Sequence, residues 1–130
     1  MSPAAPDARE SRAATFQRVL AQMALVPGVR GGLFVAPDGL VIAASLPAGI
    51  AVEPLSALAA TLGRELELRA ARLRRGSFVM AHFAGNDGTI FVAGTAVGFI
   101  VVLAGRDVNR ETVRQGLRGA AETLRKAWRR

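Results

Sequence analysis

The chain has 130 residues, of which 51% are hydrophobic and 21% charged, so it is long enough for one folded domain and unlike a disordered protein. The absence of cysteine excludes disulfides, thiolate catalysis and cysteine-ligated zinc. The net charge of +7 suggests an anionic partner, but the basic residues gather at two predicted helix ends, where the helix dipole also favours cations: Arg72, Arg74, Arg75, Arg125, Lys126, Arg129 and Arg130.

The N-terminal residues predict neither a signal sequence nor a membrane anchor. Residues 1–7 contain two prolines and no apolar periodicity, so we expect a disordered tail before one domain over residues 8–130. The longest apolar run, from Thr89 to Gly105, is shorter than the roughly 20 residues of a membrane span and is broken by glycines. We therefore expect a cytoplasmic protein without a transmembrane segment.

The first third of the chain predicts a helix followed by a hairpin. Asp7 is a candidate helix cap. The apolar residues after it recur at helical spacing: Phe16, Val19, Leu20 and Met23. Pro27-Gly28 ends this helix. Two apolar runs, residues 29–36 and 40–44, flank Pro37-Asp38-Gly39, which predicts a turn because proline presets φ and glycine accepts positive φ.

A second helix and three strands are expected next. The helix should begin at Glu53-Pro54 and end before Gly76. Its apolar stripe consists of leucines: Leu55, Leu58, Leu62, Leu66 and Leu73. The strands are predicted at residues 77–84, 89–93 and 98–104, separated by glycine-containing turns.

A last helix completes the order α-β-β-α-β-β-β-α. We expect Asp107 or Asn109 to cap it. Its apolar face carries Val113, Leu117, Ala120, Leu124 and Trp128. The strands are apolar at nearly every residue, which is typical of a sheet covered by helices on both faces. The pattern predicts an α/β (α+β) fold, a three-layer α/β/α sandwich with a five-stranded antiparallel-type sheet.

Few residues in the sequence could carry chemistry. His82 is the only histidine, so it is better interpreted as a packed or interface residue than as a metal ligand. Asp38 and Asp87 lie in predicted turns. The run Gly28–Gly32 looks like a phosphate loop, but it precedes a strand, whereas phosphate binding needs a following helix. We predict no catalytic activity, no cofactor and no metal.

The second helix carries a row of small residues beside its leucines. Glycine inside a helix costs about 1 kcal/mol relative to alanine, and close approach of a second copy of the helix would compensate for that cost at Gly63. An alanine-rich surface helix with a tolerated glycine is the alternative. If two helices pack across a dimer axis, the strand at residues 77–84 is expected to pair alongside. The candidate dimer interface is Ser56, Ala59, Ala60, Gly63, Phe78, Met80 and His82.

The last helix offers a second candidate surface. Its arginines recur at three, four or seven residues: Arg110, Arg114, Arg118, Arg125 and Arg129. Such a ridge could bind nucleic acid or an anionic membrane surface, although no aromatic residue is interleaved for base stacking. A solvated helix face is the alternative interpretation.

Several stretches, in their order and spacing, resemble the Roadblock/dynein light-chain family. They are residues 26–32, 37–43, 55–62, Gly76 and the glycine-rich turn before Thr89. The resemblance covers residues 16–124 and is strongest to the bacterial MglB-like regulators of small GTPases. It implies a profilin- or longin-like fold and a homodimer in which the second helix and third strand pair with their twins.

The resemblance also implies a function. Family members act as adaptors for Ras-like GTPases or motor components, and MglB-like dimers stimulate GTP hydrolysis without supplying a catalytic residue. We therefore expect a non-catalytic module that binds a small Ras-like GTPase. The candidate partner-binding residues on the second helix are Arg64, Glu67 and Arg72.

Overall fold

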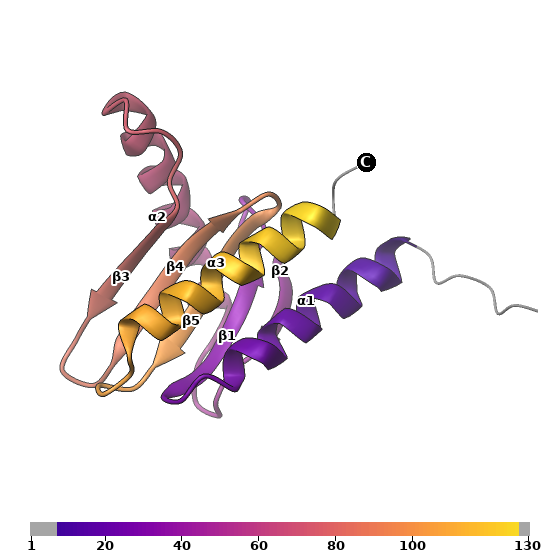
Figure 1. The fold of residues 1–130 in the computed structure, drawn as a ribbon, viewed down its shortest axis with the longest axis vertical. Coiled ribbons are helices and arrows are strands. Elements are labelled where there is room, and N and C mark those ends of the chain that lie inside the picture. Colours follow the sequence, from indigo (N-terminus) through magenta and orange to yellow (C-terminus); the bar gives the residue numbers. More distant parts are fainter. Residues whose placement is uncertain (1–7, 128–130) are drawn as a thin grey trace, which may run out of the picture.

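The computed structural model describes residues 8–127, and the side chains of residues 12–127. The predicted order of elements is confirmed (Figure 1). The elements are α1 (Ala8–Ala24), β1 (Val29–Val35), β2 (Val41–Ser45), α2 (Val52–Arg72), β3 (Met80–Ala84), β4 (Thr89–Thr95), β5 (Gly98–Ala104) and α3 (Arg110–Ala127). The expected tail, the Asp7 cap, Trp128, Arg129 and Arg130 lie outside the described residues.

The five strands form one antiparallel sheet in the order β2-β1-β5-β4-β3. β1 and β5 lie at its centre, where Leu33 is opposite Val101 and Phe34 is opposite Ile100. The strands β2 and β3 form its two edges. Because β5 has a strand on both sides and helices above and below, its residues are almost all buried, which explains its continuous apolar sequence.

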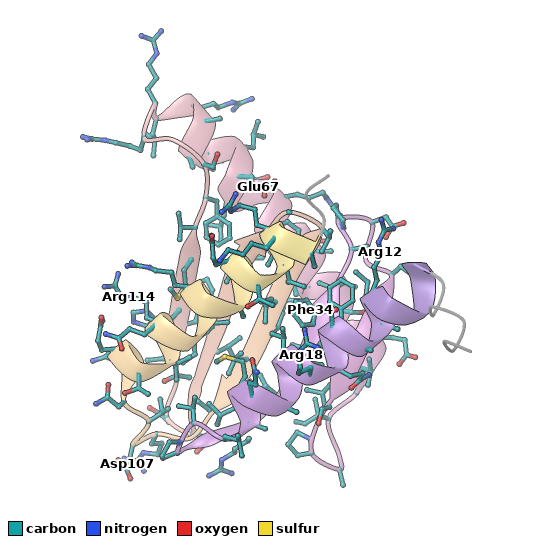
Figure 2. The ribbon with its side chains drawn as sticks, turned by 45° about the vertical axis from the view of Figure 1, so that its right-hand side comes forward. Arg12, Arg18, Phe34, Glu67, Asp107 and Arg114 are labelled. Atoms are coloured by element: carbon teal, nitrogen blue, oxygen red, sulfur yellow. The ribbon has the colours of Figure 1, made fainter. Side chains whose placement is uncertain are left out.

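Helices α1 and α3 lie side by side on one face of the sheet, and α2 lies on the other, so the three-layer prediction is confirmed (Figure 1). Between the sheet and the α1/α3 pair, Phe34 meets Phe16 edge-on with ring centroids 4.6 Å apart, and Figure 2 shows Phe34 pointing into this layer. The core here includes large side chains from both helices: Phe16, Val19, Leu20, Met23, Val113, Leu117 and Leu124.

A separate core lies beneath α2. Its buried members come from the opposite faces of the same strands together with two alanines of the helix: Leu33, Val35, Ala59, Ala60, Val92, Phe99 and Val101. The strand residues are bulky and the helix residues are small. The backbone of α2 therefore lies close to the sheet. The leucines of α2 lie to the side of this helix–sheet contact.

The C-terminal end of α2 differs from the sequence prediction. The helix ends at Arg72, and Arg74 has φ of +56°, the left-handed conformation that normally favours glycine after a helix. The amide of Arg75 donates to the carbonyl of Ala70 and that of Arg74 to the carbonyl of Ala71, which is the Schellman pattern. The helix ends before Gly76, as expected, but the left-handed residue that caps it is Arg74 and not the glycine.

The third strand is also shorter than expected. It begins at Met80 rather than Ser77, and Phe78 precedes it. Phe78 packs against the α2-side core, whereas Met80 packs against the α1/α3-side core. Phe78, predicted to lie within this strand, therefore packs on the opposite side of the sheet from Met80, because the chain outside the strand does not follow its alternation.

The start of α3 decides between the two predicted caps. The side chain of Asn109 accepts a hydrogen bond from the amide of Thr112 at 3.0 Å, so Asn109 is the cap. None of the described helices is both long and apolar enough to cross a membrane.

Candidate protein-interaction surface

The small-residue row of α2 faces the sheet of its own chain. Ser56, Ala59, Ala60 and Gly63 are all buried, with Ser56 only 3% exposed. A Cβ atom at residue 63 would lie 2.6 Å from the ring of Phe99, so the glycine permits close approach to β5 and not to a second helix. We therefore correct their assignment to a dimer interface: these four residues form the subunit's own helix–sheet contact.

The leucines of α2 take the outer position instead. Leu55 and Leu62 are half-buried, and Leu58 is 59% exposed. With strand residues they line an apolar groove of about 270 Å³ between α2 and the edge of the sheet. Its lining is entirely apolar: Leu55, Leu58, Ala59, Leu62, Phe83, Ile90, Val92 and Val101. The predicted leucine stripe thus presents an apolar surface beside the helix–sheet contact.

The groove borders the open edge strand β3. This strand pairs with β4 on one side and has no strand partner on the other among the described residues. Phe83 points to the groove side and is 45% exposed. His82 points to the other side, where its ring centroid is 5.7 Å from that of Phe91 and its Nε2 atom lies 3.5 Å from Nη1 of Arg110. An unpaired edge beside an apolar groove can accept another strand and helix.

The three predicted partner-binding residues are exposed but do not converge on one spot. Arg64 donates a hydrogen bond to the carbonyl oxygen of Pro37 in the β1–β2 turn. Glu67 lies beside Gly94 near the β4–β5 turn. Arg72 lies at the last residue of α2, more than one helical turn beyond Glu67. The helix therefore presents polar groups toward two different turns and at its free end.

The arginine ridge of α3 is partly neutralised by carboxylates. Arg114 pairs with Glu111 at 2.9 Å, and Arg125 pairs with Glu122. The hydrogen bond to Arg114 lowers the pKa of Glu111, and the bonds to these carboxylates raise the pKa of Arg114 and of Arg125. Both arginines point away from the core into solvent, as Figure 2 shows for Arg114. Two arginines of the ridge are thus in exposed ion pairs, and such pairs add little stability.

The remaining candidate groups lie apart from one another. Asp38 accepts a hydrogen bond from the amide of Leu40 at 3.0 Å, which is its predicted role in the turn. Gly28, with φ of +91°, lies in the turn after α1, and Gly31 and Gly32 lie inside β1, as expected for turn and strand geometry. Within residues 8–127, no three carboxylate or imidazole side chains are grouped to hold a metal ion. The groove and the sheet edge beside it remain as candidate binding surfaces.

Known sequences and structures resemble this chain. The model of the Roadblock/LC7 domain matches residues 15–104. An uncharacterized protein of Methanocaldococcus jannaschii is 31% identical over 108 residues, which cover 83% of this chain and 95% of that protein. This relative is archaeal, whereas the MglB-like regulators that the sequence resembles are bacterial.

Solved structures with little sequence identity share the fold. Myxococcus xanthus MglB superposes with a TM-score of 0.81 at 14% identity, over 97% of this chain and 92% of that chain. An MglB with a tetrameric arrangement gives 0.78 at 20% identity, over 98% and 96% of the two chains. A Schizosaccharomyces pombe profilin gives 0.62 at 12% identity, over 89% and 98%. The predicted profilin-like fold class is thus confirmed.

Proposed function

Because the chain belongs to the Roadblock/LC7 domain family, we propose that it is a non-catalytic homodimeric module that binds and regulates a small Ras-like GTPase. The observation that carries this proposal is the apolar groove between α2 and β3, which lies next to an unpaired sheet edge. An apolar groove and an unpaired strand edge both favour binding of a protein partner. A second copy of the chain would supply an identical groove and an identical strand edge.

The dimer would be isologous, with the same residues contributed by each subunit. Two β3 strands placed edge to edge about a twofold axis run antiparallel, which is the orientation of every other strand pair in the sheet. The two α2 helices then lie on the same side of the enlarged sheet and cover each other's leucines. We expect the joint surface to exceed about 1,200 Å², the lower limit of a stable interface.

The proposed dimer interface differs from the one expected from sequence. On α2 it uses the leucine side of the helix instead of the small-residue row. Met80 and His82 remain in it as members of the edge strand, and Phe78 flanks it. The residues whose apolar side chains would be covered are Leu55, Leu58, Leu62, Phe83 and Ile90.

The GTPase would bind the outer layer that the paired α2 helices create. Arg64, Glu67 and Arg72 are exposed there and offer charged groups to a partner. The module would act by holding the GTPase and arranging the GTPase's own catalytic residues. This fits a chain with one histidine and no cysteine, whose described carboxylates are all on exposed residues.

The dimer is tested by Leu58→Glu. A buried carboxylate at each of two symmetric positions is costly, so we expect the variant to elute as a monomer while keeping its circular dichroism spectrum. Leu25→Glu is the matched control, because Leu25 is 81% exposed just after α1, away from α2 and β3. Light scattering should give twice 13.6 kDa for the wild type and the control. A wild-type monomer at all concentrations contradicts the proposal.

The GTPase interaction is tested with a Ras-like GTPase from the same genome, loaded with GTP. We expect a co-eluting complex and a change in the rate of GTP hydrolysis, both lost in Arg64→Ser and retained in Arg30→Ser, a charge-matched change in β1. A wild-type dimer that neither binds nor affects any such GTPase would overturn this part of the proposal and leave the dimer intact.

A further inference from the structure

The C-terminal end of α2 projects beyond the sheet as an isolated tip (Figure 1). Every residue from Ala71 to Ser77 is exposed. Five exposed residues at this end form what we call the α2 tip: Leu68, Arg72, Leu73, Arg74 and Arg75. Their side chains reach solvent from the end of the helix and its capping turn, and they take no part in either core.

The α2 tip is strongly basic. No acidic residue occurs from residue 68 to residue 86. Arg69, one turn before the end of the tip, pairs with Glu65 at 2.8 Å, whereas Arg72, Arg74 and Arg75 have no carboxylate partner among the described residues. This differs from α3, where glutamates neutralise Arg114 and Arg125. Three arginines without an ion pair in the described part of the chain therefore lie within four consecutive residues at this projecting end.

The α2 tip is also apolar. Leu73 is 70% exposed and Leu68 is 46% exposed, and both lie among the arginines. Leucine side chains flanked by arginines are typical of segments that enter the boundary between lipid headgroups and acyl chains. The arginines then contact phosphates while the leucines leave water.

The backbone of the tip has an unusual conformation at Arg74. Its φ of +56° makes it the only non-glycine residue with positive φ within the described chain. Glycine is the residue normally favoured at this position of a Schellman cap, because a Cβ atom is disfavoured there. The sequence holds a long cation at a position where glycine would be more stable. Replacing Arg74 by glycine therefore removes the charge while keeping the backbone conformation of the cap.

We propose that the α2 tip binds the surface of an anionic lipid bilayer, with Arg72, Arg74 and Arg75 at the headgroup phosphates and the two leucines in the interface. Nucleic acid fits the tip less well, because the tip has no aromatic ring on which bases could stack and leucines add nothing to phosphate contacts. The contact is peripheral and needs no membrane-crossing helix.

The test is sedimentation of the full chain with vesicles of phosphatidylcholine and phosphatidylglycerol, compared with vesicles of phosphatidylcholine alone. Two variants remove the two kinds of contact: Arg74→Gly with Arg75→Ser, and Leu73→Asn. The control is Arg110→Ser with Arg114→Ser, which removes the same charge from the predicted ridge of α3. Solution mass and thermal unfolding are measured for each, and Arg74→Gly should not lower the melting temperature because glycine suits its backbone.

We expect binding to the anionic vesicles only, weakening as salt rises. Each arginine contributes about fivefold to membrane partitioning, so the double tip variant should bind about 25-fold more weakly. Leu73→Asn should reduce partitioning about tenfold or more, since a buried leucine side chain becomes polar. The partitioning of the α3 control onto anionic vesicles should stay within a few-fold of the wild-type value.

Three outcomes would overturn the proposal. The first is no binding to anionic vesicles at low salt. The second is equal loss of binding in the α3 control, which would mean that net charge alone attracts the bilayer. The third is unchanged binding in Leu73→Asn, which would make the contact purely electrostatic and would place no side chain in the lipid. A tip that binds duplex DNA but not vesicles falls under the first outcome.

Discussion

The two faces of the sheet are covered in different ways. On one face, α1 and α3 close the core with large side chains such as Phe16, Leu117 and Leu124, all nearly inaccessible. On the other, a single helix packs through small residues, and its leucines are left at the side of the contact. Two helices complete a core within the subunit, whereas one closely packed helix leaves an apolar strip exposed.

The largest expected effect comes from shortening one leucine on each face. Leu117→Ala should lower the free energy of unfolding by about 2–5 kcal/mol at any protein concentration, because it leaves a cavity between α3 and the sheet. Leu58→Ala removes an exposed side chain and leaves no cavity in the subunit. Its effect should shrink as the protein is diluted, because it acts on the dimer.

Urea denaturation at several protein concentrations measures both variants. Loss of stability in Leu58→Ala that is independent of concentration would show that this leucine belongs to the subunit core, and the contrast between the two faces would be wrong.

A glycine in each helix sharpens the comparison. Gly63→Ala should destabilise the protein by about 1–3 kcal/mol, because its Cβ atom would overlap the buried ring of Phe99. Gly119→Ala in α3 has open space around its Cβ position and should stabilise the protein by up to about 1 kcal/mol through helix propensity. Chemical denaturation gives both values. If both substitutions changed the free energy of unfolding in the same direction, the close packing of α2 on β5 would be contradicted.

The smallest effects concern the helix starts. Asn109→Ala should cost about 1 kcal/mol, because the capping bond to the amide of Thr112 is lost. Helix α2 begins after Ala51, whose side chain makes no capping bond although its backbone is extended, as a cap requires. Ala51→Ser should therefore add about 0.5 kcal/mol or more to stability. Thermal melts of the two variants should shift in opposite directions.

Most of the fold could be predicted from the sequence. Strand order along the chain follows from apolar runs separated by turn residues such as Pro37-Asp38-Gly39, and the two covering layers follow from β5, which is apolar at every residue after Gly98. Element boundaries are less accessible to such reasoning. The end of α2 depends on Arg74 adopting a conformation typical of glycine, which residue type alone does not indicate.

The orientation of α2 could not be predicted, because its small-residue row and its leucine stripe are both apolar. Leucine is more often buried than exposed, so residue type alone favours burial of the stripe. The strands decide otherwise: Phe99 and Val101 fill the space beneath the helix, and only small residues fit opposite them. The one feature of the sequence that could have indicated this orientation is Gly63 in the middle of the helix, together with the bulky Phe99 in the central strand.

Hydrogen exchange along β3 tests the central claim most directly, because it reports on the sheet edge itself. The account predicts slow exchange for all amides of Met80–Ala84 in the wild type, becoming fast at alternate positions on dilution or in Leu58→Glu. Alternate amides that exchange rapidly in concentrated wild-type protein would show that no second copy pairs with this strand.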